Sequence, residues 1–371
     1  MENNEKLAKV SMYQFERVLV DQFAEYNQFI SSSSSGNFRQ TTYWGNIKSF
    51  SGWIPQYYLL KKDGKIIAVS SLLVRRMPVV PFSLIYCCRG PVVDWSDCEA
   101  CKVLFNNLKQ VLFDNNGFCL RLDPEPCLDV PSQEVTLFNH GLLKLKERVT
   151  TWNRNLYTVR IFLDANKDEL FTRMRRTHRQ NINKSIKLGV SVSTGLASDD
   201  RNIFFRLMSG LEGKRNSLIH SEQYYHNIYD TIIGEGSGYF IKALYQGQVI
   251  SGLIVIILGG RAWAVFIAND YEYRKLMPNK LLLWEAIKLA RNNGCKFIDF
   301  GSTQGTEHFD PENDPLDMLK NAYRPQIVQF PGYYDLKGKH YSLFRFFENV
   351  VLPVALGLYY KLNRFIKNDR G

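Results

Sequence analysis

A run of cations between residues 173 and 187 has the residue types and spacing to bind a polyanion. Its members are Arg173, Arg175, Arg176, Arg179, Lys184 and Lys187. No acidic residue interrupts this stretch, so the run would present an uncompensated positive surface. Phosphate backbones bind such surfaces with strong salt dependence. Most charge runs are solvated helix faces, however, so the run indicates either contact with nucleic acid or an anionic membrane, or a solvated face.

Cysteine and histidine offer little for metal chemistry. The chain has seven cysteines, an odd number spread through apolar segments, and six histidines. Cys98 and Cys101 form a CxxC pair, but a zinc site needs a second pair of ligands, and no matching spacing occurs. We therefore expect no metal and free thiols, which suits a reducing compartment. The N-terminus lacks the apolar segment of a secretion signal, which favours the cytoplasm.

The elements that position these residues occur in a repeated order. Asn-Asn-Gly ends a predicted helix at Gly117 and again at Gly294, and a short apolar strand ending in aspartate follows each. These strands end at Asp123 and Asp299. We expect each glycine to take the left-handed conformation that ends the helix. The repeat predicts two similar α/β domains in tandem.

A β-hairpin precedes each copy of this unit. The hairpins turn at Gly64 and Gly247, which lie 183 residues apart. The period of the apolar residues also predicts helices over residues 11–29 and 97–114, a strand over 152–163, and a helix after Asp164. The length of 371 residues and the 45% hydrophobic content allow two domains with sizeable cores. A net charge of +11 favours polyanionic partners, although a generically basic protein has the same composition.

An ordered set of short motifs resembles the Fem family of peptidoglycan-bridge aminoacyltransferases and covers nearly the whole chain. The motifs are Phe38-Arg-Gln-Thr-Thr-Tyr-Trp44-Gly45-Asn-Ile-Lys48, Tyr86-Cys-Cys-Arg-Gly90-Pro91, Leu120-Arg-Leu-Asp123-Pro124-Glu125, Arg179-Gln-Asn-Ile-Asn-Lys, Lys214-Arg215, Tyr224-Tyr225, Asp299-Phe-Gly301 and Leu319-Lys320. No single motif is decisive, but the ordered set is specific.

The resemblance implies an α/β fold of two tandem acetyltransferase-like (GNAT) domains, each a mixed sheet flanked by helices. We expect domain 1 over residues 1–152, domain 2 over 153–327 and a helical tail over 341–371; a strand near 328–340 could return to complete domain 1. The interval 188–239 shows no heptad run, so the chain resembles the armless type within the family.

The resemblance also implies a reaction. The family transfers an amino acid from aminoacyl-tRNA to an amine of the stem peptide of a peptidoglycan precursor, either lipid II or UDP-MurNAc-pentapeptide. We accordingly expect aminoacyl-tRNA as co-substrate, no cofactor and a monomer. The cationic run at residues 173–187 would then contact tRNA or an anionic surface.

Site residues follow from the same resemblance. Lys320 occupies the family position near the transferred acyl group, where an ammonium can stabilise an oxyanion, and Leu319 stands where an aromatic residue is commoner. Lys48 and Arg215 fall where the family binds the precursor's diphosphate. The remaining candidates for substrate binding are Trp44, Tyr224, Tyr225 and Gly301.

Asp123 is the candidate for holding or deprotonating the incoming amine, because it ends a strand where domain 1 should open. A turn residue before Pro124 and substrate-assisted proton transfer remain alternatives. The loop after Asp299 resembles the family least between residues 305 and 315, so we expect this protein's own specificity there.

Two other functions remain open. One is a GNAT-fold acyltransferase that uses acyl-CoA in polysaccharide or lipid biosynthesis, but the expected pyrophosphate turn reads Arg274-Lys-Leu-Met-Pro278-Asn-Lys280, without glycine. The other is a non-enzymatic protein that binds nucleic acid or membrane. An apolar stretch at residues 350–360 with basic flanks suits peripheral contact with the inner membrane face, and a tail helix packed on the body is the alternative.

Overall fold

The computed structural model describes residues 12–127, 130–145, 156–214, 221–234, 236–303, 321–352 and 354, with the side chains of 130, 131 and 211–214 left out. The chain divides into two compact units. Unit 1 comprises Met1–Gly45, Trp53–Trp152 and Pro331–Gly371, and unit 2 comprises Asn46–Gly52 and Asn153–Phe330.

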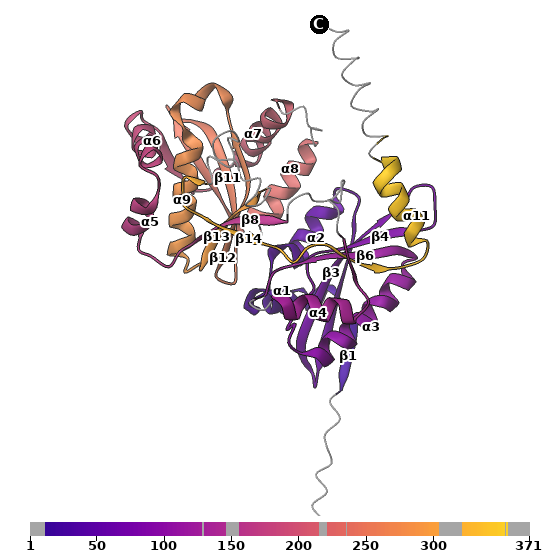
Figure 1. The fold of residues 1–371 in the computed structure, drawn as a ribbon. Coiled ribbons are helices and arrows are strands. Elements are labelled where there is room, and N and C mark those ends of the chain that lie inside the picture. Colours follow the sequence, from indigo (N-terminus) through magenta and orange to yellow (C-terminus); the bar gives the residue numbers. More distant parts are fainter. Residues whose placement is uncertain are drawn as a thin grey trace, which may run out of the picture. The chain divides into compact units, whose positions relative to one another are not determined.

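Unit 1 is built on a mixed sheet with the order β1-β2-β3-β4-β6-β15-β7, and β5 pairs with β3 (Figure 1). The strands are β1 Tyr13–Arg17, β2 Ile54–Lys62, β3 Lys65–Arg76, β4 Ser83–Arg89, β5 Val92–Val93, β6 Gly117–Pro124, β7 Leu143–Lys144 and β15 Tyr334–Lys337. β4 and β6 run parallel, whereas β15 pairs antiparallel with β6. β15, which follows all of unit 2 in the sequence, therefore completes the sheet of unit 1.

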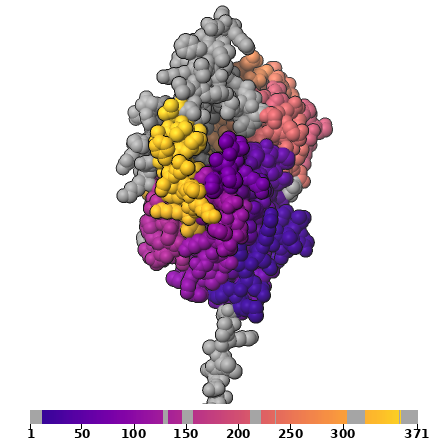
Figure 2. Space-filling model, turned by 90° about the vertical axis from the view of Figure 1, so that its right-hand side faces the viewer, coloured from indigo at the N-terminus to yellow at the C-terminus, as the bar shows by residue number. Residues whose placement is uncertain are grey.

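Helices cover both faces of this sheet. They are α1 Phe23–Ser32, α3 Cys98–Asp114, α4 Val130–Asn139 and α11 Tyr341–Phe346, which continues into the π-helical turn η5 Phe347–Val351, together with the start of α2 Thr42–Ser49, whose residues 46–49 belong to unit 2. Along β6, Leu120 and Leu122 enter the core with α3, whereas Cys119 and Arg121 face α11 and η5. Figure 2 shows α11 and η5, in yellow, on the surface of unit 1.

Unit 2 carries a second mixed sheet, of order β14-β8-β13-β12-β11-β10-β9. The strands are β8 Tyr157–Phe162, β9 Ser191–Ser193, β10 Gly238–Tyr245, β11 Gln248–Leu258, β12 Arg261–Asn269, β13 Phe297–Thr303 and β14 Gln326–Gln329. The helices are α5 Lys167–Arg173, α6 Arg176–Lys187, α7 Asp200–Lys214, α8 Glu222–Tyr229 and α9 Pro278–Asn292, with the shorter turns η3 Asp230–Gly234 and η4 Tyr271–Leu276. α5, α6 and α9 lie on one face of the sheet, and α7 and α8 lie on the other (Figure 1).

The repeat seen in the sequence is a repeat of structure. Hairpin β2–β3 corresponds to β10–β11, and each turns at a glycine with a φ of 79°. The unit α3–β6 corresponds to α9–β13, and both β6 and β13 add parallel to an earlier strand of their sheet. The predicted helix over residues 97–114 is confirmed, since Asp97 caps α3 by accepting a hydrogen bond from the Ala100 N–H.

Three local expectations were wrong. Residues 13–17 form strand β1 rather than a helix, because Phe15 stacks on Tyr58 as β1 pairs with β2. The segment after Asp164 is two helices, broken between α5 and α6. Gly294 is left-handed at the end of α9, but after α3 the left-handed residue is Asn116, with a φ of 47°.

Gly117 is required for a different reason, namely close packing at the start of β6. A Cβ there would lie 2.2 Å from the Leu112 side chain. Asparagine tolerates the left-handed region better than most residues, so Asn116 can end α3 in its place.

Candidate functional site

Asp123 ends β6 in a buried ion pair. The parallel register of β4 and β6 places Cys88 opposite Asp123, which brings the next residue, Arg89, to the carboxylate. The Arg89 backbone N–H donates to Oδ1 at 2.9 Å, and Arg89 Nη1 lies 3.3 Å from Oδ2. The Asp123 residue is 1% exposed. The carboxylate is therefore held in one orientation, away from bulk water.

The surroundings of Asp123 shift its proton affinity. Burial raises the pKa of Asp123 above the ordinary aspartate value, and the Arg89 guanidinium and N–H offset part of that rise. A carboxylate with a raised pKa accepts a proton more readily than an exposed one. Burial, with a contribution from Asp123, also raises the pKa values of Tyr86 and Tyr333, so both hydroxyls stay protonated beside the carboxylate.

Two amide side chains support the turn that follows β4. Gln40 Nε2 donates to the Cys88 carbonyl at 2.7 Å, and its Oε1 accepts the Ser71 N–H at 2.9 Å. A Cβ on Gly90 would lie 2.3 Å from the Gln40 amide carbon, so only glycine allows this approach. Asn37 Nδ2 donates to Glu125 Oε2 at 3.0 Å, two residues beyond Asp123. These contacts fix the backbone on both sides of the ion pair.

Trp44 and Lys48 both lie on α2. Trp44 is buried and meets Phe38 edge-to-face at 5.2 Å, and the Arg39 guanidinium lies 4.5 Å above the Phe38 ring. Lys48 is half-buried in the last turn of α2, where the helix dipole favours a cation. Trp44 thus contributes to the packing of unit 1, and Lys48 lies at the end of a helix suited to positive charge.

Unit 2 has a matching ion pair on the corresponding strand. The expected strand end at Asp299 was wrong, because β13 continues to Thr303 with an irregular register between Asp299 and Ser302. Arg160 Nε donates to Asp299 Oδ2 at 3.0 Å, and Thr158 Oγ1 donates to Oδ1 at 2.6 Å. The Gly301 N–H also donates to Oδ1, at 2.8 Å, and Gly301 has a φ of 85°. Both oxygens of Asp299 are thus occupied by donors, one of them at the irregular stretch of β13 between Asp299 and Ser302.

Tyr224 and Tyr225 lie in the first turn of α8. The hydroxyl of Ser221 caps this helix by accepting the Tyr224 N–H at 3.2 Å. Tyr225 is buried and meets Phe204 edge-to-face at 5.8 Å, whereas Tyr224 is half-buried. Of the two rings, Tyr224 is the more accessible to a ligand.

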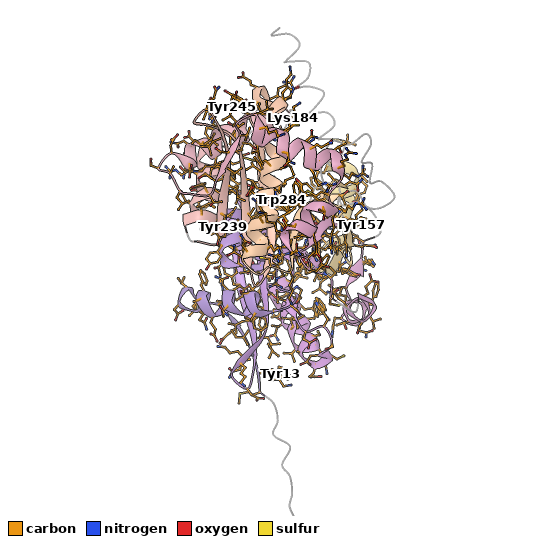
Figure 3. The ribbon with its side chains drawn as sticks, turned by 90° about the vertical axis from the view of Figure 1, so that its left-hand side faces the viewer. Tyr13, Tyr157, Lys184, Tyr239, Tyr245 and Trp284 are labelled. Carbon is orange, nitrogen blue, oxygen red and sulfur yellow. The ribbon has the colours of Figure 1, made fainter. Side chains whose placement is uncertain are left out.

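The predicted cationic run is divided between α5, α6 and their junction. Arg173 pairs with Asp164 at 3.0 Å, so one charge of the run is neutralised by an acid outside it. α6 buries His178, Ile182 and Ser185. The cations lie on the other faces of α6 and at its start. Four of them are exposed and one is half-buried: Arg175, Arg176, Lys184 and Lys187 are exposed, and Arg179 is half-buried. Lys184 is labelled in Figure 3. Among the described residues, these five form no ion pair.

Some candidates cannot be placed, and others were missed. Arg215, Leu319 and Lys320 lie outside the described residues, as does the tail beyond residue 354. The partners Arg89, Tyr333 and Arg160 were not predicted as site residues. The signal that could have identified Arg89 is an arginine at the end of a strand, followed directly by Gly-Pro.

Within the described segments, no helix has both the length and the apolar character to cross a bilayer. No group of three or more metal-binding side chains occurs there either.

Comparisons with known proteins agree with this architecture. A lipid II:glycine glycyltransferase of Staphylococcus haemolyticus (strain JCSC1435) is 22% identical over 380 residues, which cover 84% of this chain and 90% of the relative. The crystal structure of FemX matches with a TM-score of 0.81 at 20% identity, over 91% of this chain and 100% of FemX.

A tandem GNAT protein from the clavulanic acid biosynthesis pathway matches with a TM-score of 0.52 at 11% identity, over 88% of this chain and 98% of that protein. The predicted fold class of two tandem GNAT-like domains is thereby confirmed. The FemAB family model matches residues 22–243 and 233–349, which together span most of both units. The chain therefore belongs to the FemAB family.

Proposed function

We propose that this protein is an aminoacyltransferase that moves an amino acid from aminoacyl-tRNA to an amine of a peptidoglycan precursor stem peptide. The product would be a cell-wall bridge. The observation that carries the proposal is the FemAB match over both units, together with relatives named lipid II:glycine glycyltransferases. The acceptor would be lipid II or the nucleotide-linked UDP-MurNAc-pentapeptide.

The buried carboxylate of unit 1 supplies the chemistry that the acceptor needs. An amine attacks an ester only when it is neutral, so its ammonium form must lose a proton. Asp123 has a raised pKa and a fixed orientation, which suit a group that holds the amine and accepts this proton. Arg89 would keep Asp123 in place without contacting the substrate.

The remaining roles follow the family resemblance. Lys320 would stabilise the oxyanion that forms on the ester carbonyl. Lys48 and Arg215 would bind the diphosphate of the precursor, and Trp44, Tyr224, Tyr225, Leu319 and Gly301 would line the substrate site. The exposed cations of α6, with Arg173 and Arg175, would contact the tRNA backbone.

No cofactor is needed for this reaction, because the aminoacyl ester is already activated. An acyl-CoA donor is less well supported. α9 begins with Pro278 directly after the left-handed Met277, and no side chain caps it. This helix start lacks the glycine turn on which GNAT enzymes seat a pyrophosphate. We further propose that the protein is a monomer that acts at the cytoplasmic face of the membrane.

The test uses purified protein, tRNA charged with radiolabelled amino acids, and either UDP-MurNAc-pentapeptide or lipid II. Labelled peptide product is expected from at least one charged tRNA. Label that moves only from an acyl-CoA would overturn the proposal. Lys320→Met should lower turnover by about 10²–10³-fold while the fold is retained. Lys296→Met, which removes an exposed lysine of unit 2, is the matched control and should leave turnover unchanged.

A further inference from the structure

The C-terminal helical segment of unit 1 has one buried face and one exposed apolar face. On the buried face, Phe344 stacks on Phe118 at 5.2 Å, and Glu348 binds Arg121 at 2.6 Å. The opposite face, here called the C-terminal stripe, consists of Leu343, Phe346, Phe347, Val350, Val351 and Val354. Their spacing of three and four residues places them on one side of the helix. Exposure reaches 64% at Leu343 and 61% at Val354, so the stripe is open along its length.

A second exposed apolar element lies beside the start of this helix. The hairpin loop, residues 77–82, joins β3 to β4 and is closed by the Met77 N–H, which donates to the Phe82 carbonyl. Phe82 packs against His340 and Phe118, each with ring centroids 4.9 Å apart. The tip is open, since Val79 is 90% exposed. The loop and the stripe thus belong to the same side of unit 1.

Most of the exposed charges around these elements are positive, with Asp114 at the end of α3 as an exposed acid nearby. Lys109, Lys337 and Lys339 line a hollow of about 240 Å³ with Phe113, and Arg76 is exposed at the base of the hairpin loop. Between residues 337 and 354 the one acid is Glu348, which is buried in its ion pairs. The sequence contains no further acid until Asp369. Apolar side chains flanked by cations are typical of elements that bind the interface of anionic membranes.

We propose that unit 1 docks onto an anionic lipid bilayer through the C-terminal stripe and the hairpin loop. A bilayer fits both features at once, because the stripe can enter the acyl boundary while the lysines and Arg76 contact lipid phosphates. This surface is more extensive than the tail alone, since it joins a loop and a helix that are far apart in the sequence.

The docking surface lies next to the candidate site. The helical segment follows β6, from Phe118 opposite Phe344 to Arg121 opposite Glu348. Asp123 is two residues beyond Arg121 and on the same face of the sheet, because side chains alternate along a strand. Docking would therefore hold the Asp123 end of β6 near the bilayer. This consequence rests on the proposed function, which places a lipid-linked acceptor there.

Vesicle flotation of the full chain tests the docking surface without any assay of activity. Wild-type protein is expected to bind phosphatidylcholine vesicles that contain phosphatidylglycerol, more weakly at high salt. Phe346→Glu with Phe347→Glu should lower the partition coefficient on the order of tenfold or more, and Val79→Asp should lower it less. All three side chains are exposed, so thermal unfolding should match that of the wild type. Val135→Glu, at an exposed apolar position on α4, is the matched control and should bind as wild type does.

Wild-type protein that does not float with these vesicles, or a double variant that floats as wild type does, would overturn the proposal. A comparison of acceptors separates this outcome from a failure of the proposed function. Two transfer rates are compared for each protein, one to lipid II in vesicles and one to soluble UDP-MurNAc-pentapeptide. In the double variant, the ratio of the first rate to the second should fall in parallel with the fall in its partition coefficient. An unchanged ratio would overturn the link to the site. Absence of any transfer by wild type would overturn the proposed function and leave vesicle binding standing.

Discussion

At the scale of single residues, two aspartates lie on corresponding strands, β6 and β13, but their environments differ. Asp299 accepts three hydrogen bonds, from Thr158, Arg160 and the Gly301 N–H, so both of its oxygens are bound within the sheet of unit 2. Asp123 accepts the Arg89 N–H at Oδ1, and its Oδ2 faces the guanidinium at 3.3 Å. Burial raises the pKa of Asp123, which suits this carboxylate to take a proton from a substrate.

Asp123→Asn should therefore lower turnover by about 10²–10⁴-fold, the usual contribution of a general base. The amide keeps the shape of the side chain but cannot accept the proton. Steady-state kinetics with the soluble acceptor measures the effect. Asp114→Asn, at an exposed carboxylate on α3, is the control and should retain full turnover. Equal turnover of the two variants would remove Asp123 from the reaction.

The pH dependence of turnover should also reveal the ionisation of Asp123. Activity requires ionised Asp123, so the rate falls as pH falls through its pKa. Because burial raises that pKa, the acidic limb should lie at higher pH than an exposed aspartate would give. A pH–rate profile at saturating tRNA is the measurement. If the limb persists in Asp123→Asn, another group causes it.

The strands that carry these aspartates could be predicted from the sequence, but their arginine partners could not. The strands that carry Asp123 and Asp299 follow from local rules, because a helix end and an apolar alternation depend on neighbouring residues. The end of the second strand does not follow from them, since β13 continues to Thr303. Their arginine partners are 34 and 139 residues away in the sequence. Only the order of the strands in each sheet determines which arginine lies beside each aspartate. Local patterns also failed at residues 13–17, where pairing with β2 outweighed a helical period.

At the scale of elements, a buried ion network attaches the C-terminal segment to β6. Arg121 donates to both oxygens of Asp335 on β15 and to both oxygens of Glu348 on η5. Tyr341 donates to Asp335, and Arg345 pairs with Glu348. Burial opposes the Arg121 charge, but the hydrogen bonds to Asp335 and Glu348 outweigh it and raise the pKa of Arg121. One side chain thus joins a strand, a returning strand and a helix.

Arg121→Met should cost about 3–5 kcal/mol in the free energy of unfolding, because it leaves two buried carboxylates without their main partner. Urea unfolding measures the change. The comparison is Arg201→Met, which breaks a half-exposed pair with Asp230 and should cost about 0–1 kcal/mol. Similar losses in both variants would contradict the assignment of Arg121 as the anchor of this segment.

Two glycines offer a second contrast between elements. A Cβ on Gly338 would lie 2.0 Å from the Gly117 carbonyl oxygen, at the turn between β15 and α11. Since backbone cannot yield as a side chain can, Gly338→Ala should lower the melting temperature by several degrees or more. Gly210 lies in α7 with open space around it, and Gly210→Ala should stabilise by about 0.5–1 kcal/mol. Calorimetry should show a lower melting temperature for Gly338→Ala and a higher one for Gly210→Ala. A shift of both melting temperatures in the same direction would refute this contrast.

At the scale of the whole molecule, positive charge occurs on both units but with different companions. On unit 1 it flanks exposed apolar residues, which suits a bilayer. On unit 2 the α6 cations outnumber the exposed apolar side chains beside them, which are Ile186 and Leu188 among the described residues of this segment, and this suits a hydrated polyanion such as tRNA. The chain thus offers separate surfaces for its two proposed macromolecular partners.

Lys184→Glu with Lys187→Glu should weaken tRNA binding by on the order of tenfold or more and flatten its dependence on salt. The measurement is filter binding across a salt series. Lys65→Glu with Lys102→Glu makes the same change of charge at exposed positions of unit 1 and should have a much smaller effect. If the two pairs weaken binding equally, net charge rather than α6 governs the affinity.

The place of β15 in the sheet has a consequence for how the protein is made. β6, which carries Asp123, receives its second neighbour from residues 334–337, near the C-terminus. During synthesis the whole of unit 2 leaves the ribosome before this strand does. Until then β6 exposes an unpaired edge, which invites association with other chains. A nascent or truncated chain that lacks β15 would also lack the completed sheet beside Asp123, so the site of unit 1 can form only after residues 334–337 have been made.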